Sequence, residues 1–418
     1  MTDQPRRPAG SQTGGPFAEH QPTSLDLGTS WPAVQHREAT WTAIDRSASR
    51  RQQTANRGMF SYAVTPAIRN STPDIDAELA ADADDALTAV EDFDRVSEGW
   101  GTPFASVLLR SESASSSQIE NLTSSARKVA LASLGDSSSR NASLVARNVA
   151  ALRAAIDLAD NISPNAIRAM HERLDGGDDP ENSGKFRTQP VWIGGASPVT
   201  ASFVAIHHDQ IEEAIDDLVA FMKRDDLQPL VQAALAHAQF ETIHPFTDGN
   251  GRTGRALVSS ILRRRGSARH MSVPISSGLL ADTSEYFSAL TSYRQGDVAP
   301  IVEQFSAASR RSVANASVLR EDVANVRDQV LATASRRTAN LVILADLCAS
   351  EPAFNAEMLV QRSVPTASAY RILDRLQEAG VVRCEGPIRG SMVWTVPALT
   401  DALDRFAERA GRRTFNQP

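Results

Sequence analysis

Cysteine and long apolar runs are both scarce in this sequence, and each shortage excludes a class of protein. The two cysteines, Cys348 and Cys384, have no metal-ligand spacing around them. Neither a disulfide framework nor a zinc site is therefore expected, and a reducing cytoplasm suits the chain. No stretch approaches the roughly 18 apolar residues of a spanning helix, and the N-terminus lacks the apolar segment of a secretory signal. We expect a cytoplasmic protein that does not enter a membrane.

A strong charge of either sign is also missing. The formal net charge is −7 over 418 residues, and basic residues do not gather along the chain. Nothing therefore indicates a nucleic-acid coat or a membrane-surface binder. The composition, 41% hydrophobic and 22% charged, is that of a globular chain long enough for two or three domains.

Changes in composition and periodicity divide the chain into segments. Residues 1–58 are rich in Gly, Pro, Ser, Thr and Gln without a sustained apolar period, which predicts a disordered leader. The segments predicted after it are an N-terminal helical region (59–135), a core (136–308), a helical connector (309–338), a small C-terminal unit (339–397) and a tail (398–418).

Apolar residues recur at helical spacing through most of the chain, so we expect a mainly α fold. The acidic stretch at residues 74–98 is predicted to be a solvated helix that covers the core. Residues 185–195 break the pattern with β-branched and aromatic residues closed by paired glycines, which predicts a short strand or hairpin projecting from the helical body. Further helices are predicted at residues 117–134, 141–159, 165–174, 211–224, 230–242 and 301–339.

The string HPFTDGNGRTGR at residues 244–255 carries the clearest chemistry. It is a polar, glycine-rich turn that follows one apolar helix and opens another. A helix start with glycines at Gly249 and Gly251 presents free backbone N–H groups and a positive dipole end, which favours an anion such as phosphate. Arg252 and Arg255, three residues apart, fall on one face of the first turn, where they can hold further phosphate oxygens.

Two other side chains of the string complete a reaction site. Asp248 offers a hard oxygen ligand for a magnesium ion shared with the phosphates. His244 offers a group that accepts a proton near neutral pH, next to the position of a phosphorus atom. Together these residues predict in-line attack of a hydroxyl on a nucleotide phosphate. The alternative is an ordinary glycine-rich loop between helices.

The string resembles the signature of the Fic (Fido-domain) family, HPFx[DE]GN[GK]RxxR, at every specified position. The resemblance covers roughly residues 100–308 and implies a protein adenylyltransferase with a Fic-type helical core, which moves AMP from ATP onto a hydroxyl of a target protein. It implies His244 as the general base, Phe246 as a core anchor, Asp248 as the Mg²⁺ ligand, and a nucleotide site made of Asp248, Gly249, Asn250, Gly251, Arg252, Thr253, Gly254 and Arg255. Asn250 and the glycines would hold the α-phosphate region, and the arginines the β- and γ-phosphates.

Two details of the resemblance bear on the substrates. Gly251 favours adenylyl transfer, since relatives with lysine there can reverse the nucleotide and phosphorylate instead. Tyr286 resembles the residue beside the adenine and is predicted to stack on it, although an aromatic at helical spacing is often just core.

The element at residues 185–195 matches the family's flap, on which a target segment docks by strand addition. Its docking residues would be Phe186, Arg187, Thr188, Val191, Trp192 and Ile193. The alternative is a purely structural hairpin.

His207 and His208 stand where relatives commonly have prolines. Adjacent side chains are expected to point apart, so we do not predict a paired metal site there.

Residues 116–121, SSQIEN, fit the family's inhibitory pattern of Ser or Thr, three residues, Glu, then Gly or Asn. The resemblance implies that Ser116 and Glu120 belong to an inhibitory helix, with Glu120 paired to Arg255 in competition with the γ-phosphate of ATP. The alternative is a simple N-capped helix start. In some relatives the same glutamate orients a water that removes AMP, so removal of AMP and other nucleotide or phosphate transfer stay open.

The C-terminal unit resembles a winged helix-turn-helix, with helices at residues 340–349, 356–361 and 366–379 and strands around 381–384 and 392–396. Its third helix balances Arg371 and Arg375 with Asp374 and Glu378, so DNA binding is possible but not favoured over a protein contact or a homodimer. The rival to an enzyme is a DNA-binding regulator whose Fic core senses nucleotide. The intact signature favours the enzyme, since a sensor would more readily lose His244.

Overall fold

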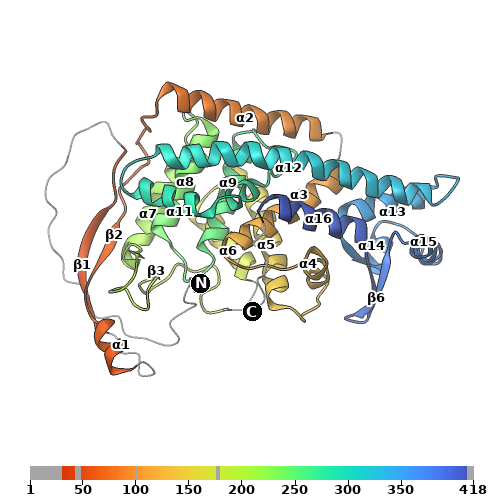
Figure 1. The fold of residues 1–418 in the computed structure, drawn as a ribbon, viewed down its shortest axis with the longest axis horizontal. Coiled ribbons are helices and arrows are strands. Elements are labelled where there is room, and N and C mark those ends of the chain that lie inside the picture. Colours follow the sequence, from red (N-terminus) through yellow and green to blue (C-terminus); the bar gives the residue numbers. More distant parts are fainter. Residues whose placement is uncertain (1–30, 43–48, 99–100, 176–178, 412–418) are drawn as a thin grey trace.

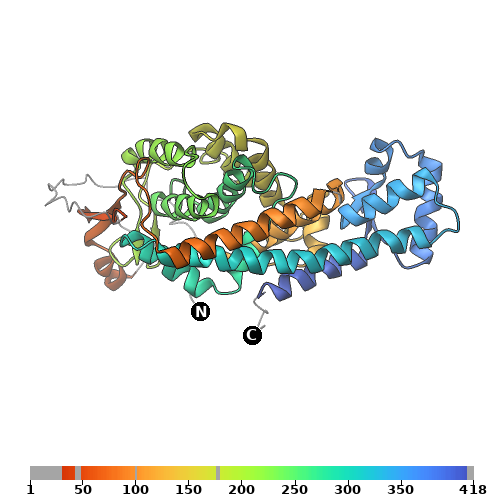
Figure 2. The same cartoon turned by 90° about the horizontal axis from the view of Figure 1, so that it is seen from above.

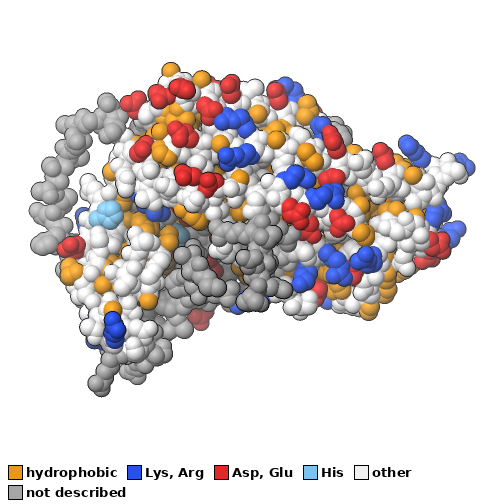
Figure 3. All heavy atoms as spheres, in the orientation of Figure 1, with side chains coloured by type: hydrophobic (Ala, Val, Ile, Leu, Met, Phe, Trp, Pro, Cys, Tyr) orange, Lys and Arg blue, Asp and Glu red, His pale blue; other side chains and the backbone are white. Residues whose placement is uncertain are grey.

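The computed structural model describes residues 31–42, 49–98, 101–175 and 179–411. It confirms the mainly helical fold, with a few short strands (Figure 1). Within the described residues, no helix has the length and apolarity to cross a membrane. Acidic and basic side chains are interspersed over the face drawn in Figure 3, so neither sign dominates there. The predicted disordered leader lies outside the described residues up to position 30.

Helix α8 (Pro229–Ile243) is the centre of the core. Every residue from Leu230 to Ile243 is buried, because neighbouring elements surround the helix and its polar side chains find partners inside, such as Gln239 with Tyr293. Pro229 occupies the first turn, where its missing N–H costs nothing, and Gln228 caps the helix. Helix α8 packs against α7 (Ile211–Met222), α9 (Asn250–Arg264) and α12 (Ala299–Ala332). The remaining core helices are α5 (Arg140–Asp157), α6 (Pro164–Asp175), α10 (Ile275–Leu280) and α11 (Thr283–Arg294).

Two long helices run along the molecule beside each other. The acidic helix predicted at residues 74–98 is α2 (Ala77–Ser97), which packs along α12 (Figure 2). Its inner face buries Leu79, Leu87, Val90 and Phe93. Asp94 is buried there too and accepts from the backbone N–H groups of residues 269–271. Helix α12 begins in the core and reaches the C-terminal unit without a break. The boundary predicted at residue 308 is therefore wrong, because a single helix covers both segments.

Part of the predicted leader is ordered. Strand β1 (Gln35–Trp41) pairs antiparallel with β2 (Gly58–Val64), and α1 (Arg50–Ala55) lies between them in the chain. Trp31 is 3% exposed and packs against Phe221 and Tyr293 of the core. The prediction of disorder is therefore wrong for the described residues of 31–58. The segment has little apolar surface of its own, but β2 and the core supply the burial that it lacks.

The single helix predicted at residues 117–134 is also wrong. Helix α3 (Gly101–Ile119) ends just before Glu120, Asn121 takes a left-handed conformation with φ 61°, and α4 (Ala126–Ser133) begins after a Ser125 cap. Glu120 therefore follows the end of a helix. The alternative that it lies at an N-capped helix start is wrong as well.

The C-terminal unit contains the predicted elements and one more strand. Its helices are α13 (Ala339–Ser350), α14 (Ala356–Gln361) and α15 (Thr366–Glu378). Its antiparallel sheet has the order β5–β7–β6, from β5 (Ala353–Asn355), β6 (Arg383–Ile388) and β7 (Ser391–Thr395). The predicted tail is wrong over its described part, since α16 (Pro397–Arg409) buries Leu399, Leu403 and Phe406 and packs along α12 and α3.

Candidate active site

His244 lies directly after the last turn of α8, in a left-handed conformation with φ 51°. Its Nδ1 lies 3.3 Å from the carbonyl oxygen of Glu241. A carbonyl only accepts, so Nδ1 carries the hydrogen and Nε2 keeps a free electron pair. Burial and the guanidinium of Arg187 lower the pKa of His244 to about 3. The ring is thus neutral near pH 7 and able to accept a proton at Nε2.

Buried hydrogen bonds hold the loop that follows, residues 245–249, which we call the signature loop. The amide of Asn250 bridges Phe246, accepting from its N–H at 2.8 Å and donating to its carbonyl at 2.9 Å. Phe246 is fully buried and stacks on His171, with ring centroids 3.8 Å apart. The predicted core anchor is therefore in the core.

His171 of α6 fixes the loop from a second side. Its Nδ1 accepts from the N–H of Gly184, so its Nε2 carries the hydrogen and donates to the carbonyl of Asp248 at 3.0 Å. Nothing in the string itself indicates this residue, because it comes from another helix. Its ring fixes both Phe246 and the backbone at Asp248.

Arg187 is a buried support of the same loop. Its guanidinium donates to the carbonyl oxygens of His244, Gln189, Ile206 and Ile243, and the residue is 3% exposed. The prediction that Arg187 docks a target is therefore wrong, since the side chain points inward. Phe186 is partly buried as well, beneath the guanidinium of Arg168 at 4.3 Å.

The outer part of the predicted flap is short. Strand β3 (Trp192–Ile193) pairs with β4 (Phe203–Val204), and Thr188 is exposed beside it. The Trp192 ring packs on Trp41 of the N-terminal hairpin, with centroids 5.8 Å apart. Val191, Trp192 and Ile193 are partly buried. The segment is thus a small hairpin that packs against the β1–β2 hairpin.

The start of α9 presents backbone N–H groups beside His244. Gly249 caps this helix in a left-handed conformation with φ 73° and makes no side-chain cap bond, so the first-turn N–H groups lack a capping acceptor. The Asp248 side chain is 79% exposed, and one of its oxygens accepts from the N–H of Gly249. Thr253 and Gly254 point inward, where a Cβ on Gly254 would meet Phe240 at 2.9 Å.

Glu120 lies between both arginines of the string. Its Oε1 accepts from Nη2 of Arg255 and its Oε2 from Nε of Arg252, each at 2.7 Å. The predicted pair was with Arg255 alone, so the structure adds Arg252. Burial opposes ionisation of Glu120, but the attraction of the two guanidinium groups outweighs it and lowers the pKa of the carboxyl. The ion pairs persist at any pH near neutral.

Residues 116–121, which we call the Glu120 turn, contact the same arginines further. Arg255 donates to the hydroxyl and the carbonyl of Ser116. A Cβ on Gly251 would lie 2.4 Å from Oε1 of Glu120, so a side chain at position 251 would require the carboxylate to shift. The Glu120 turn therefore covers the α9 end of the site.

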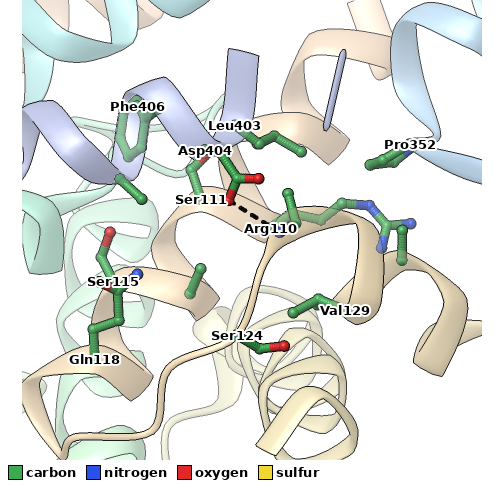
Figure 4. Close-up of a pocket in the computed structure, with 14 residues that line it drawn as sticks. Arg110, Ser111, Ser115, Gln118, Ser124, Val129, Pro352, Leu403, Asp404 and Phe406 are labelled. Carbon is green, nitrogen blue, oxygen red and sulfur yellow. Dashed lines mark hydrogen bonds between the residues drawn. The ribbon is translucent and has the colours of Figure 1, made fainter. Parts of the chain in front are cut away.

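The opposite face of α3 borders a pocket against the C-terminal unit. Figure 4 shows Ser115 and Gln118 of α3 beside this pocket, with Leu403 and Phe406 of α16 across from them. The N–H of Ala126 donates to Asp404 there. Ion pairs of Arg110 with Glu351 and of Arg127 with Glu385 also join this region to the C-terminal unit.

Tyr286 lies in the core rather than on an open surface. It is 1% exposed, and its hydroxyl lies 2.7 Å from Nε2 of His237. The ring next to it, Phe287, is 46% exposed, with centroids 5.1 Å apart. Stacking of Tyr286 on adenine stays a prediction, and it requires the surrounding side chains to move.

His207 and His208 do not point apart as expected. Their ring centroids lie 4.1 Å apart, and each ring has a nitrogen 3.4 Å from the Asp209 carboxylate. Burial lowers the pKa of both rings. The three residues form the one group of potential metal ligands found among the described residues, although the Asp209 side chain is 77% exposed.

Comparison with known proteins identifies the region of the signature. Residues 161–262 match the Fic/DOC family model. A curated relative, protein adenylyltransferase fic-1 of Caenorhabditis elegans, is 32% identical over 157 residues, which are 37% of this chain and 28% of the relative. Protein adenylyltransferase Fic of Drosophila mojavensis is 34% identical over 136 residues, 32% of this chain and 25% of the relative. The chain thus spans about a quarter of the length of these relatives.

Two of the solved structures similar to this chain have low identity and TM-scores under 0.5. A Fic family protein from Desulfovibrio desulfuricans G20 has a TM-score of 0.48 at 22% identity, over 80% of this chain and 97% of that one. A fragment of Fic-1 from C. elegans has a TM-score of 0.43 at 23% identity, over 57% and 73%.

Proposed function

Since residues 161–262 form a Fic/DOC family domain, we propose that this chain is an ATP-dependent protein adenylyltransferase that transfers AMP to a hydroxyl of a target protein. One observation carries the proposal. His244, neutral and with a free Nε2, lies near the start of α9, which has no side-chain cap, and near the buried Arg252 and Arg255. A base, an anion cradle and two phosphate-binding cations next to one another suit transfer from a nucleotide.

The reaction follows from the roles that these groups take. His244 Nε2 accepts the proton of the target hydroxyl while the hydroxyl oxygen bonds to the α-phosphorus of ATP. The bond from the α-phosphorus to the bridging oxygen breaks, and pyrophosphate leaves. The N–H groups at Asn250 and Gly251 hold the α-phosphate, joined by that of Gly249 once it leaves the Asp248 carboxylate. Arg252 and Arg255 hold the β- and γ-phosphates.

The residues present suit a magnesium ion. Asp248 has an exposed carboxylate at the α9 start, and its contact with Arg252 is long, at 3.7 Å. An oxygen ligand beside a phosphate site is what Mg²⁺ prefers. Asp248 would hold the ion, which would supply charge neutralisation of the phosphates.

Glu120 would act as a brake on this activity. Its carboxylate takes the two guanidinium groups that the γ-phosphate needs, so ATP binds without its α-phosphorus aligned. The target segment would dock along Val191, Trp192 and Ile193, whose short pairing with β4 leaves room for strand addition.

The alternative activity on the same site is removal of AMP, with Glu120 orienting a water. A DNA-binding regulator with a nucleotide-sensing core is the rival of another class. Its C-terminal unit would have to bind DNA through α15, whose charges nearly cancel. The intact His244, fixed by its bonds to Glu241 and Arg187, favours transfer.

The test uses ATP labelled on either the α- or the γ-phosphorus, incubated with the whole chain and a lysate of its own cells. Label from the α-phosphorus should attach to protein and pyrophosphate should be released, with no attachment from the γ-phosphorus. His244→Ala should lower attachment by about 10²- to 10⁴-fold without loss of ATP binding, and excess chelator should stop it. Attachment of the γ-label, or undiminished transfer by His244→Ala, would refute the proposal.

A further inference from the structure

The last turn of α8 brings a second ionisable group to the base. Glu241 lies three residues before His244, and its Oε2 is 3.7 Å from His244 Nδ1, the nitrogen that donates to the Glu241 carbonyl oxygen at 3.3 Å. Both oxygen atoms thus come from one residue and lie on the side of the ring opposite Nε2. The carboxyl group of Glu241 therefore lies beside Nδ1 of His244, away from Nε2, which would accept the proton.

The hydrogen bonds of the core give the Glu241 carboxyl group no other role. Glu241 is 7% exposed, and its Oε1 has no hydrogen-bond partner among the described residues. A Cβ on Gly254 would lie 3.3 Å from this oxygen, so the glycine leaves the space that the carboxyl occupies. A buried carboxyl oxygen without a hydrogen-bond partner lowers the free energy of unfolding. A role in the reaction would explain why such a group is kept.

We propose that Glu241 is a positioning residue for transfer, which fixes the His244 ring and balances the positive charge that the ring gains with the proton of the target hydroxyl. The inference rests on the proposed function. In the step, the proton passes from the hydroxyl oxygen to His244 Nε2, the oxygen bonds to the α-phosphorus, and pyrophosphate leaves. The hydrogen on Nδ1 stays there, between the Glu241 carbonyl and its carboxylate.

The electrostatics explain why a carboxylate is needed here. Burial and Arg187 lower the pKa of His244 to about 3, so the ring releases a proton too readily to hold it during transfer. An anion next to Nδ1 opposes this effect. Oriented carboxylates behind a histidine act in this way in other enzymes that use histidine as a base.

The charge state of Glu241 depends on the groups around it. Burial raises its pKa to about 7; Arg255 on α9 lowers it, Glu120 raises it and Arg294 on α11 lowers it. His237 and Tyr286 complete the ionisable neighbours on α8 and α11, and burial keeps both of them neutral near pH 7. Because the carboxyl ionises as pH rises through about 7, transfer should rise over the same range.

The experiment measures AMP transfer by the whole chain against pH, in the Glu120→Gly background so that turnover is measurable. Glu241→Gln keeps the shape and removes the charge. We expect kcat to fall by about ten- to a hundredfold with the KM for ATP unchanged, and the rise with pH to disappear. In the parent the midpoint of that rise should lie at or below 7, since Glu120, which raises the Glu241 pKa, is absent.

Two further variants separate this effect from damage to the fold. Glu112→Gln alters a carboxyl that is also buried, with its pKa raised to about 7, and that accepts from Ser276 on α10. It should keep the pH profile of the parent. Glu241→Asp keeps the charge and should retain the pH-dependent rise at a reduced rate, which decides the matter if Glu241→Gln does not fold.

The outcomes are distinguishable from failure of the proposed function. If the parent attaches no α-label, or His244→Ala attaches as much as the parent, the proposed function itself fails. If the parent is active and Glu241→Gln keeps both its rate and its pH profile, only the role of Glu241 is overturned. A flat profile for Glu241→Asp would overturn it as well.

Discussion

The signature loop and the Glu120 turn both contact Arg252, through Asp248 and Glu120, but they are held in different ways. The loop is held by buried contacts from three residues outside it: Asn250 at the start of α9, His171 of α6, and Arg187, whose N–H donates to the Pro245 carbonyl. The side chain of Glu120 is held by the two arginines that it contacts. A polyphosphate could replace a carboxylate on those arginines, whereas nothing in the reaction replaces the contacts of the loop.

The signature loop is the permanent part of the site. Buried polar groups that are fully paired fix a single conformation, and Asn250, His171 and Arg187 supply such groups to the loop. Under the proposed function the Glu120 turn would be an exchangeable cover, because its Glu120 side chain is 21% exposed and its partners are also the predicted phosphate ligands. Changes in the loop should therefore abolish transfer, and changes in the turn should increase it.

The largest effect on this comparison is expected from Asn250→Ala. The change leaves the N–H and carbonyl of the buried Phe246 unpaired, so we expect a loss of about 2 kcal/mol in the free energy of unfolding. Transfer should fall by about a hundredfold or more, because His244 and the α9 start are no longer fixed relative to each other. Chemical denaturation and label transfer measure the two effects.

A matched change sharpens the Asn250 prediction. Asn250→Asp keeps an acceptor for the Phe246 N–H and loses the donor to its carbonyl, so it should lie between the parent and Asn250→Ala in both measurements. Equal rates for all three chains would mean that the loop does not depend on this amide.

A smaller effect is expected from Ser116→Ala in the turn. The hydroxyl accepts from Arg255 Nε at 2.9 Å, and its loss weakens the cover without removing Glu120. We expect a rise in transfer of a few fold, in keeping with about 1 kcal/mol for one hydrogen bond. Ser115→Ala, on the adjacent residue that borders the pocket in Figure 4, should leave the rate unchanged. A rise of the same size in both variants would show loosening of α3 instead.

The sequence predicts the parts of the site that are local. The helices on either side of the loop follow from apolar spacing, and His244, Asn250 and the glycines lie in one string. Contacts from elsewhere could not be predicted in this way. His171 reaches the loop from α6, and the burial of Arg187 depends on carbonyls of two other segments.

The prediction of disorder for the N-terminal hairpin is wrong for a related reason. Strand β1 buries only Ala39 and Trp41 of its seven residues, which is too little to signal a strand, and its stability comes from β2 and from packing on Trp192. The prediction omitted the contact of Glu120 with Arg252 because it placed Glu120 within a helix. In the structure α3 ends at Ile119, and the chain after this end decides where the carboxylate points. Tertiary contacts decide such cases.

In the proposed reaction the γ-phosphate needs the arginines that Glu120 contacts, and the rate of AMP transfer by Glu120→Gly measures this competition. A charge-assisted pair of this kind is worth about 1.5 to 3 kcal/mol, so transfer should rise by about ten- to a hundredfold over wild type, with ATP affinity kept. Adding Arg255→Ala should cancel the gain, because the γ-phosphate then has no fork to bind. An unchanged rate for Glu120→Gly in a chain whose transfer depends on His244 would contradict such a competition.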